Sequence, residues 1–492
     1  MNVVTSSAEV KRVEQKAKET LPSLALMESA ALKCWCILAK LVKPADSLLV
    51  LVGGGNNGAD ALAIARHAYH GGLTKITVLQ VAQRFSVEHE TQQALVSEYP
   101  ITQLFLDETD LNTLPSFDWI VDGLTGLGLR GELNESLTEV VNWVNNNKGS
   151  VFSVDIPSGL GDQVPVNGPS IHADYTVALG SYTQSHYHSL TRTRCGELTW
   201  ANPSFSLNLL NSVERVAIVD KEPLSLPPLD RSAYKNSRGS VAIFGSSSAY
   251  SGAARLSARA AFAARGGLVS LFCDPEIYEI AASESPSVMV HPYQGQEVTG
   301  FDAILAGPGW GEGREGYLKT LLDSSIPLVL DADGIRALSS LVVSGEYEGT
   351  SMPMILTPHL GEIRVLGEAV LKKRCFLSTD TPEEFFTQLQ TVAQTLGATI
   401  VLKSSLIHIA QGDGSVTILE GLNPSLGVAG SGDVLAGVVV ALLGQGFSPS
   451  DAALLGSKIH LQSGVRAHEE LGYYDSESLI GYIGSVVKEA ER

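Results

Sequence analysis

The fold of this 492-residue chain is decided by residues 47–81, which read SLLVLVGGGNNGADALAIARHAYHGGLTKITVLQV. The apolar run from Ser47 to Val52 predicts a strand, and the helical spacing of apolar residues from Ala59 to His70 predicts a helix. A second apolar run, from Lys75 to Val81, predicts another strand. We expect the glycine-rich segment between the first strand and the helix, residues 53–58, to have no regular structure. The order strand, helix, strand is typical of a parallel sheet covered by helices.

The same alternation continues along the chain. Further strands are predicted at Trp119–Val121, Val151–Asp155, Tyr175–Leu179, Ser240–Phe244, Leu268–Phe272, Asp302–Ala306, Leu328–Leu330, Met354–Leu356 and Thr399–Leu402. The pattern is interrupted between Asn211 and Arg238, where three prolines lie among charged residues, and this composition indicates a linker. We therefore predict two α/β domains, residues 1–220 and 225–492.

Composition excludes several classes of protein. The chain has 34 Lys and Arg against 53 Asp and Glu, a net charge of −19, which argues against binding a nucleic acid backbone. Five cysteines are too few for a disulfide scaffold and favour a reducing compartment. The N-terminus lacks the pattern of a signal peptide, and no apolar run is long enough to cross a bilayer. We expect a cytoplasmic protein that binds neither nucleic acid nor a membrane.

The first glycine loop fits the pattern G-x-G-x-x-G through Gly53, Gly55 and Gly58. A dinucleotide fold of the usual kind needs an acidic residue about 20 residues later, but the next strand ends without one. The loop can still hold an anion, because its amides and the helix N-terminus point outward. The alternative is an ordinary glycine–asparagine turn with Asp60 as a partner of the helix dipole.

Two other strand ends carry polar side chains, Asp122 on one and Asp155 with Ser158 on the next. The carboxyl ends of parallel strands share one edge of the sheet, so Asn57, Asp122 and Ser158 are expected to converge there. Their oxygen atoms suit a hard cation and not zinc. The alternative is that each caps a helix.

These loops, together with Leu26–Ala30 and the glycine loop 126–131, resemble the NAD(P)H-hydrate epimerase family over the whole first domain. The resemblance implies a Rossmann-like three-layer α/β/α sandwich that interconverts the R and S forms of hydrated NADH and NADPH. It implies potassium ligands at Asn57, Asp122 and Ser158 and a catalytic role for Asp155. It places the substrate-binding residues at Asn56, Asn57, Gly58, Ala59, Asp60, Gly126, Leu127, Gly128, Leu129, Arg130, Gly131, Glu132 and Asp155.

The first domain departs from that family at several positions. Ala59 and Ala61 replace glycines, and their methyl groups are expected to hinder close approach of a ligand to the backbone. Thr183 stands where the family usually has a lysine, and Gly161 interrupts the usual Gly-Leu-Asp sequence. An alternative is therefore that the first domain is a binding module without turnover.

The second domain contains the stretch Asn423–Asp433, NPSLGVAGSGD, followed by an apolar helix predicted at Val434–Leu443. Amides of the Gly-Ser-Gly turn would stabilise negative charge on a phosphoryl group in transfer. Asp433 is then placed to accept a proton from a substrate hydroxyl, and the alternative is a helix cap. The motif resembles the anion hole and base of the ribokinase-like fold, and no Walker loop occurs.

Other strand ends of this domain carry matching features. Lys403 ends one strand and is a candidate to bind phosphates of a donor nucleotide, and the alternative is a solvated cation at the strand end. Three further strand ends carry a glycine loop at 307–311, the pair Asp331 and Asp333, and His359 in a Pro/Gly turn. For His359 we favour a ligand contact over a structural role, whereas the two aspartates are equally explained as helix caps.

Together these motifs, with Tyr250–Ala254 before a helix, resemble the NAD(P)H-hydrate dehydratase family across nearly all of the second domain. The resemblance implies a ribokinase-like α/β/α domain that phosphorylates the hydroxyl of the S hydrate from ADP and then eliminates phosphate, with Mg²⁺ as cofactor. It places substrate contacts at Ala253, Gly309, Gly311, His359 and the base Asp433. It places ADP contacts at Lys403, Ser404, Ser405, Leu406, Ile407 and Gly432.

The two resemblances predict a bifunctional repair enzyme with NAD(P)H hydrate and ADP as its small-molecule partners. By analogy with that family we expect a homo-oligomer. The rival is a small-molecule kinase, which the residues around Asp433 fit equally well.

Overall fold

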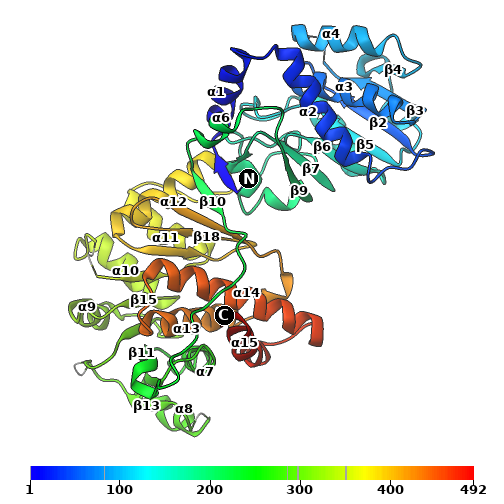
Figure 1. The fold of residues 1–492 in the computed structure, drawn as a ribbon. Coiled ribbons are helices and arrows are strands. Elements are labelled where there is room, and N and C mark those ends of the chain that lie inside the picture. Colours follow the sequence, from blue (N-terminus) through cyan, green and yellow to red (C-terminus); the bar gives the residue numbers. More distant parts are fainter. Residues whose placement is uncertain (1, 83, 285, 296–297, 350–351, 492) are drawn as a thin grey trace. The chain divides into compact units, whose positions relative to one another are not determined.

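The computed structural model describes residues 2–82, 84–284, 286–295, 298–349 and 352–491. The chain folds into two compact units (Figure 1). One consists of Met1–Ile218 and Ser378–Phe386, and the other of Val219–Leu377 and Thr387–Arg492. The short stretch 378–386 thus groups with the first unit although it lies far along the chain.

The first unit is built on one parallel sheet with the strand order β4-β3-β2-β5-β6-β7-β9. The strands are β2 Ser47–Val52, β3 Lys75–Gln80, β4 Thr102–Phe105, β5 Trp119–Gly123, β6 Ser150–Val154, β7 Tyr175–Leu179 and β9 Glu197–Ala201. The helices are α1 Ser7–Lys18, α2 Ser23–Leu38, α3 Asn56–His70, α4 Val87–Val96, α5 Glu135–Asn145 and α6 Leu207–Asn211. Outside this sheet, β1 Val3–Thr5 pairs with β8 Tyr182–Thr183 and with β10 Ala217–Val219.

Strand β2 shows why this unit has three layers. Its residues Leu48, Val50 and Val52 pack with side chains of α2 and α3, whereas Leu49 and Leu51 pack with side chains of α5. Successive side chains of a strand point to opposite faces, so a strand that is apolar throughout must be covered on both sides.

The glycine loop after β2 corrects one prediction. Residues 56–58 were expected to be irregular, but α3 begins at Asn56 and Gly55 is its N-cap. Gly58 lies so close to the loop that a Cβ there would stand 1.9 Å from the carbonyl oxygen of Gly53. The absence of a side chain therefore serves close packing of the helix start on the loop and not irregular backbone.

The second unit has a sheet with the strand order β13-β12-β11-β14-β15-β16-β17-β18-β19. It is parallel from β13 to β17, and β17, β18 and β19 pair antiparallel. The strands are β11 Ser240–Phe244, β12 Leu268–Cys273, β13 Met289–Pro292, β14 Ala303–Ala306, β15 Leu328–Leu330, β16 Met354–Leu356, β17 Thr399–Leu402, β18 Leu406–Ala410 and β19 Val416–Glu420. The helices are α7 Ala253–Ala263, α8 Tyr278–Glu284, α9 Glu315–Asp323, α10 Asp333–Ser344, α11 Leu360–Leu371, α12 Pro382–Leu396, α13 Ser431–Gly444, α14 Pro449–Leu471 and α15 Ser476–Ala490. The first residues of α12, up to Phe386, group with the first unit.

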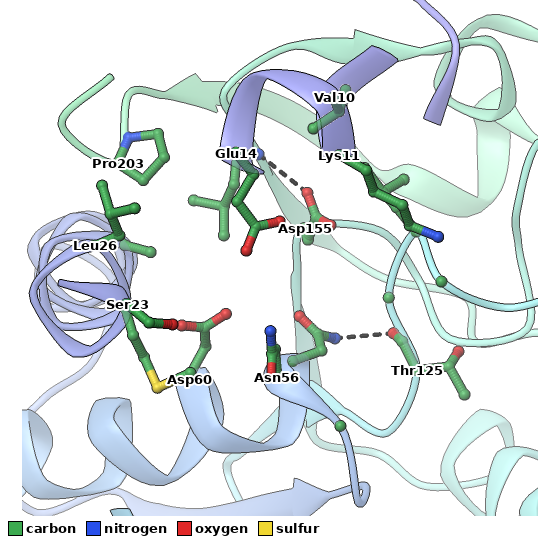
Figure 2. Close-up of a pocket in the computed structure, with 18 of the residues that line it drawn as sticks. Val10, Lys11, Glu14, Ser23, Leu26, Asn56, Asp60, Thr125, Asp155 and Pro203 are labelled. Carbon is green, nitrogen blue, oxygen red and sulfur yellow. Dashed lines mark hydrogen bonds between the residues drawn. The ribbon is translucent and has the colours of Figure 1, made fainter. Parts of the chain in front are cut away.

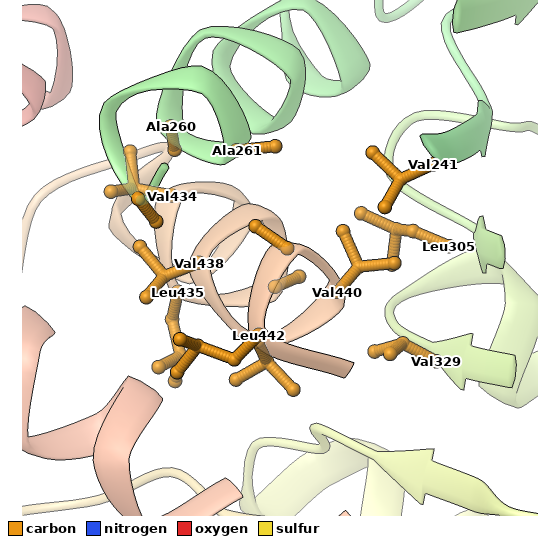
Figure 3. Packing of buried hydrophobic residues seen from close by; sticks show 14 of the residues in the cluster. Val241, Ala260, Ala261, Leu305, Val329, Val434, Leu435, Val438, Val440 and Leu442 are labelled. Atoms are coloured by element: carbon orange, nitrogen blue, oxygen red, sulfur yellow. The ribbon is translucent and has the colours of Figure 1, made fainter. Parts of the chain in front are cut away.

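Helix α13 forms the centre of this unit's core. Figure 3 shows its side chains between the strands, represented by Val241, Leu305 and Val329, and the alanines of α7. From Val434 to Gly444 every residue of α13 is buried, so the helix is apolar on all sides. Its N-terminus is thereby held rigidly at the carboxyl edge of the sheet.

The predicted α/β fold class is confirmed in both units, and the predicted strands agree with the structure within two residues at each end. The linker prediction was too simple, because the segment between Asn211 and Arg238 contains strand β10. No helix in the described part of the chain is long and apolar enough to span a membrane.

Candidate active sites

The first unit contains a cavity of about 430 Å³ beside the glycine loop after β2 (Figure 2). It is lined by Val10, Lys11, Glu14, Ser23, Leu26, Met27, Ala30, Gly55, Asn56, Asn57, Asp60, Leu124, Thr125, Gly126, Leu127, Gly128, Leu129, Asp155, Leu179, Pro203 and Phe205. One side consists of loops that follow β2, β5 and β6, as expected for a ligand site at the carboxyl edge of a parallel sheet. The other side consists of α1, α2 and the segment after β9.

Many of the predicted substrate-binding residues lie in this lining. Asn56, Asn57, Asp60, Gly126–Leu129 and Asp155 all face the cavity. The remaining predicted residues, Gly58, Ala59, Arg130, Gly131 and Glu132, are not part of the lining.

Sequence reasoning missed the contribution of the N-terminal helices. Lys11 and Glu14 come from α1, and Ser23, Leu26 and Met27 come from α2. The motif Leu26–Ala30 was a signal for α2, but nothing local marked Lys11 and Glu14. Glu28 of that motif does not line the cavity and instead contacts Arg66, His67 and Gln92, which ties α2 to α3 and α4.

The methyl groups of Ala59 and Ala61 do not hinder the site, contrary to the expectation. Both residues are fully buried, and neither lines the cavity. Ala61 belongs to the core between α3 and the sheet, where a Cβ on Gly123 would lie 2.5 Å from its methyl carbon. The two alanines therefore fill space behind the site and leave the cavity open.

Asp155 is the carboxyl group best placed for proton transfer in this cavity. It follows β6 directly and adopts a left-handed backbone conformation with a φ of 65°, which is uncommon for a residue other than glycine. Its Oδ1 accepts a hydrogen bond from the amide of Leu179 at 3.2 Å. Burial raises the pKa of Asp155 to about 7, so near neutral pH the group can both release and accept a proton.

Two further carboxyl groups share the cavity with Asp155 (Figure 2). Burial and the nearby charge of Asp155 raise the pKa of Asp60 well above its usual value, and Oδ1 of Asp60 has no hydrogen-bond partner among the described residues. Glu14 faces them from α1, and Lys11 is the one cation in the lining. The cavity is therefore acidic, with a single positive charge at its edge.

The three predicted potassium ligands are brought together around the backbone of Thr125. Asn57 Nδ2 donates to the carbonyl oxygen of Thr125 at 2.8 Å, and the amide of Thr125 donates to Ser158 Oγ at 2.8 Å. Ser158 Oγ in turn donates to Asp122 Oδ1 at 2.5 Å. The result is a polar cluster from β5 and the loops after β2 and β6, in which Asp122 and Ser158 are buried and Asn57 is half-buried. The carboxylate, hydroxyl and carbonyl oxygens of this cluster are of the kind that hard cations take.

The second candidate site lies at the N-terminus of α13. Asp433 is in its first turn, and a Cβ on Gly432 would lie 3.0 Å from Lys403 Nζ, so the ammonium group stands over the helix end. Lys403 Nζ also donates to Asp331 Oδ1 at 2.7 Å. A cation beside the positive end of a helix makes this a site where negative charge is stabilised.

The electrostatics of this site couple its charged groups. Burial, followed by repulsion from Asp331, raises the pKa of Asp433 to about 7. Burial lowers the pKa of Lys403, but attraction to Asp331 and Glu362 outweighs it, so the pKa is raised overall and the group stays charged. Asp433 can therefore act as a base close to neutral pH while Lys403 remains a cation.

The glycine loop after β14 borders the start of α7. Gly309 has a φ of 59°, and a Cβ on it would lie 3.1 Å from that of Ala253, so these two predicted substrate contacts are neighbours. The amide of Gly311 donates to Asp333 Oδ2 at 2.8 Å, which gives Asp333 a role in holding this loop. Ala253 therefore lies beside the loop that contains Gly309 and Gly311.

His359 has a structural role that the sequence did not reveal. Its Nδ1 accepts hydrogen bonds from the amides of Gly361 and Glu362, and Glu362 accepts from the amide of His359, so the residue caps α11. The ring is 57% exposed, and the predicted ligand contact stays a prediction. The other predicted ADP contacts follow Lys403 in the sequence. Ser404 and Ser405 are exposed, whereas Leu406 and Ile407 are buried in β18.

Two α/β units, each with a buried carboxyl group beside glycine loops at the ends of parallel strands, define a two-domain α/β enzyme. Comparison with known proteins specifies it further. Residues 23–185 match the family model described as YjeF-related protein N-terminus, and residues 241–484 match the one described as NAD(P)H-hydrate dehydratase. The chain belongs to the family of bifunctional NAD(P)H-hydrate repair enzymes.

Relatives align over nearly the whole length. The bifunctional NAD(P)H-hydrate repair enzyme Nnr of Thermofilum pendens is 30% identical, over 99% of this chain and 96% of the relative. The protein of that name from Coxiella burnetii is 28% identical, over 96% of both chains. Among solved structures, an ADP/ATP-dependent NAD(P)H-hydrate dehydratase from Bacillus subtilis is 22% identical over 54% of this chain and 95% of that chain, with a TM-score of 0.46.

Proposed function

We propose that the first unit interconverts R and S hydrates of NADH and NADPH and that the second unit dehydrates the S form with ADP. In this proposal the two activities correspond to the domains 1–220 and 225–492. The observation that carries it is the presence of both sites in one chain, each with a carboxyl group whose pKa lies at about 7. Cytoplasmic location and a homo-oligomeric state stay predictions.

In the dehydratase step Asp433 accepts the proton of the substrate hydroxyl. The freed oxygen attacks the terminal phosphorus of ADP, a new oxygen–phosphorus bond forms, and the bond to AMP breaks. Phosphate then leaves from the substrate carbon with loss of a proton from the neighbouring carbon, and the double bond of the nicotinamide ring returns. Lys403 and the amides at the start of α13 stabilise the charge of the phosphoryl group in transfer.

The ligands of this site are assigned by proposal. Substrate contacts fall on Ala253, Gly309, Gly311 and His359, and ADP contacts fall on residues 403–407 and Gly432. Mg²⁺ would neutralise charge on the phosphates when bound. No group of three or more His, Cys, Asp and Glu side chains in the described residues could hold a metal ion. When bound, Mg²⁺ would take most of its ligands from phosphate oxygens, with Asp331 and Glu362 as nearby carboxylates.

In the epimerase step the hydrated nicotinamide ring would bind in the cavity. Asp155 would donate a proton to this ring or accept one from it. Asn56, Asn57, Asp60 and the loop 126–129 would hold the substrate. Potassium would add positive charge near that loop when bound, and the oxygen atoms of Asn57, Asp122 and Ser158 would hold it there. The cavity is unobstructed by Ala59 and Ala61, and a carboxyl group with a pKa of about 7, that of Asp155, lies in its lining, which favours turnover over a binding module that has lost activity.

The experiment uses a mixture of R and S NADH hydrate with ADP and Mg²⁺. Absorbance follows the NADH formed, and chromatography follows both epimers. We expect both epimers to be consumed faster than they change spontaneously, with release of free phosphate. Conversion that stops at the S fraction would mean that the first unit lacks turnover. A stable phosphorylated product without NADH, with ADP or ATP, would replace the dehydratase by a kinase.

A further inference from the structure

A buried network that does not line the cavity contacts the backbone of Asp155. His186 has no exposed surface, and its Nε2 lies 2.8 Å from the carbonyl oxygen of Asp155. Its Nδ1 lies 3.0 Å from the amide of Thr183 and 2.9 Å from the hydroxyl of Thr183. The network thus connects Thr183, His186 and the backbone of Asp155.

The amide of Thr183 determines which ring nitrogen of His186 carries the proton. A backbone N–H can only donate, so Nδ1 of His186 must accept and the ring proton sits on Nε2. Nε2 then donates to the carbonyl oxygen of Asp155. Burial lowers the pKa of His186 to about 4, which keeps the ring neutral and this arrangement intact near neutral pH.

Both the amide and the carbonyl group of Asp155 form hydrogen bonds. Its amide donates to the carbonyl oxygen of Val177 at 2.9 Å, and its carbonyl oxygen accepts from His186. These two bonds fix the peptide groups that flank a left-handed φ of 65°, a conformation that persists only where the surroundings enforce it. In that conformation the carboxyl group faces the cavity and meets the amide of Leu179.

Thr183 takes no direct part in the site. It is fully buried and does not line the cavity, although the family usually has a lysine at this position. Its amide and its hydroxyl both contact Nδ1 of His186. The residue that replaces the lysine therefore orients the ring that binds the backbone of Asp155.

We propose that Thr183 and His186 are a positioning pair: Thr183 orients the ring of His186, and His186, by donating to the carbonyl oxygen of Asp155, holds the carboxyl group of Asp155 in the orientation that the reaction of the first unit needs. The proposal deepens the epimerase function proposed above and rests on it. Neither residue lines the cavity: Thr183 acts through His186, and His186 acts through Asp155.

Two substitutions of His186 separate its two hydrogen bonds. In His186→Gln the side-chain NH₂ reaches the position of Nε2 and keeps the bond to Asp155, but the bond from Thr183 is lost. In His186→Asn the side-chain oxygen takes the position of Nδ1 and keeps the bond from Thr183, but Asp155 loses its donor. Each variant leaves one buried polar group unpaired, so a general loss of stability is matched between them.

In the full-length protein we expect the Asn variant to lose about tenfold to a hundredfold in epimerase kcat with little change in KM for the R hydrate, because misplacement of a reacting group lowers kcat. The Gln variant should retain most of the wild-type kcat. His172→Asn and His172→Gln are controls at an exposed histidine and should behave as wild type. Equal losses in the Gln and Asn variants, or wild-type kcat in the Asn variant, would overturn the proposal.

Crystal structures of the wild-type protein and both variants provide a readout that does not depend on activity. Asp155 should keep its positive φ and its contact with Leu179 in the Gln variant and lose them in the Asn variant. If the wild-type protein does not convert the R hydrate, the proposed epimerase function fails, and these structures still decide whether the pair positions Asp155. An unchanged Asp155 in the Asn variant would refute that role.

Discussion

At the scale of single residues, burial gives Asp155 and Asp433 their chemistry. Each follows a strand or begins a helix, positions where an aspartate often caps backbone amides. Folding takes the carboxyl groups of both largely out of water, which raises the pKa of each to about 7. The neighbours differ, because Asp433 has Lys403 beside it and Asp155 faces other carboxyl groups. The same residue type therefore suits two different proton transfers.

We expect Asp433→Asn to lower dehydratase kcat by about 10²–10⁴-fold, because an amide cannot accept the hydroxyl proton. Epimerase activity should be unchanged, since no residue of the second unit lines the cavity of the first. Release of NADH from the S hydrate measures the first activity, and chromatography of the epimers measures the second. Asp323→Asn, at an exposed position at the end of α9, is the control. Wild-type dehydration by the Asp433 variant would remove this residue from the mechanism.

Asp155→Asn should stabilise the protein in a pH-dependent way. Because the folded state raises the pKa of Asp155, it keeps a proton between pH 4 and 7 that the unfolded state has already lost. The contribution of Asp155 to stability therefore falls as pH rises through that range. The advantage of the Asn variant should be small near pH 4 and reach on the order of 1–4 kcal/mol above pH 7. Calorimetric Tm values at pH 5 and pH 8 test this, and a difference independent of pH would contradict it.

At the scale of elements, close contact of helices holds the second site. Helix α13 lies so near α7 that a Cβ on Gly437 would stand 2.2 Å from the carbonyl oxygen of Ser257. Ser257 Oγ also donates to the carbonyl oxygen of Asp433 at 2.8 Å. The absence of a side chain at Gly437 therefore lets α13 lie close to α7, and this contact fixes the position of Asp433 and of the N-terminus of α13.

Gly437→Ala should destabilise the second unit by about 1–3 kcal/mol, because the added methyl group meets backbone that cannot move aside. Gly481→Ala is the matched control, since it lies in α15 with nothing within 4 Å of its added Cβ. There the substitution should stabilise by about 0.5–1 kcal/mol through helix propensity. Tm values of the two variants should shift in opposite directions, and equal shifts would contradict the close approach of α7 and α13.

At the scale of the whole molecule, each unit holds its own set of site residues. The cavity of the first unit and the cluster around Lys403 and Asp433 draw their side chains from separate parts of the chain. The units do not simply follow one another along the chain, because the stretch Ser378–Phe386 groups with the first unit. There its backbone contacts Asp162 and Val166.

Two inactive chains should therefore complement each other in solution. A mixture of the full-length Asp155→Asn and Asp433→Asn proteins should convert both epimers to NADH, because the S hydrate can diffuse from one chain to the other. Each variant alone should leave hydrate unconverted, the first its R form and the second both forms. Chromatography at the end of the reaction shows the result. Persistence of the R hydrate in the mixture would mean that both sites must be intact in the same chain.

The sequence by itself determined the α/β class, most strands of both sheets and the glycine loops at their ends. Periodicity and turn chemistry act over a few neighbouring residues, so they are visible in the chain. Strands β18 and β19 were missed although their sequences, LIHIA and VTILE, have the apolar and β-branched composition of strands. The motifs around Asn57, Asp155 and Asp433 were readable for the same local reason.

Only the tertiary structure decided which groups meet and what their surroundings do to them. Lys11 and Glu14 reach the cavity from α1, and Ala59 and Ala61 turn away from it into the core. The pKa of Asp155 depends on burial by segments far away in the chain. Burial and electrostatic coupling depend on distances in space, and these arise only when the sheet and its helices have packed.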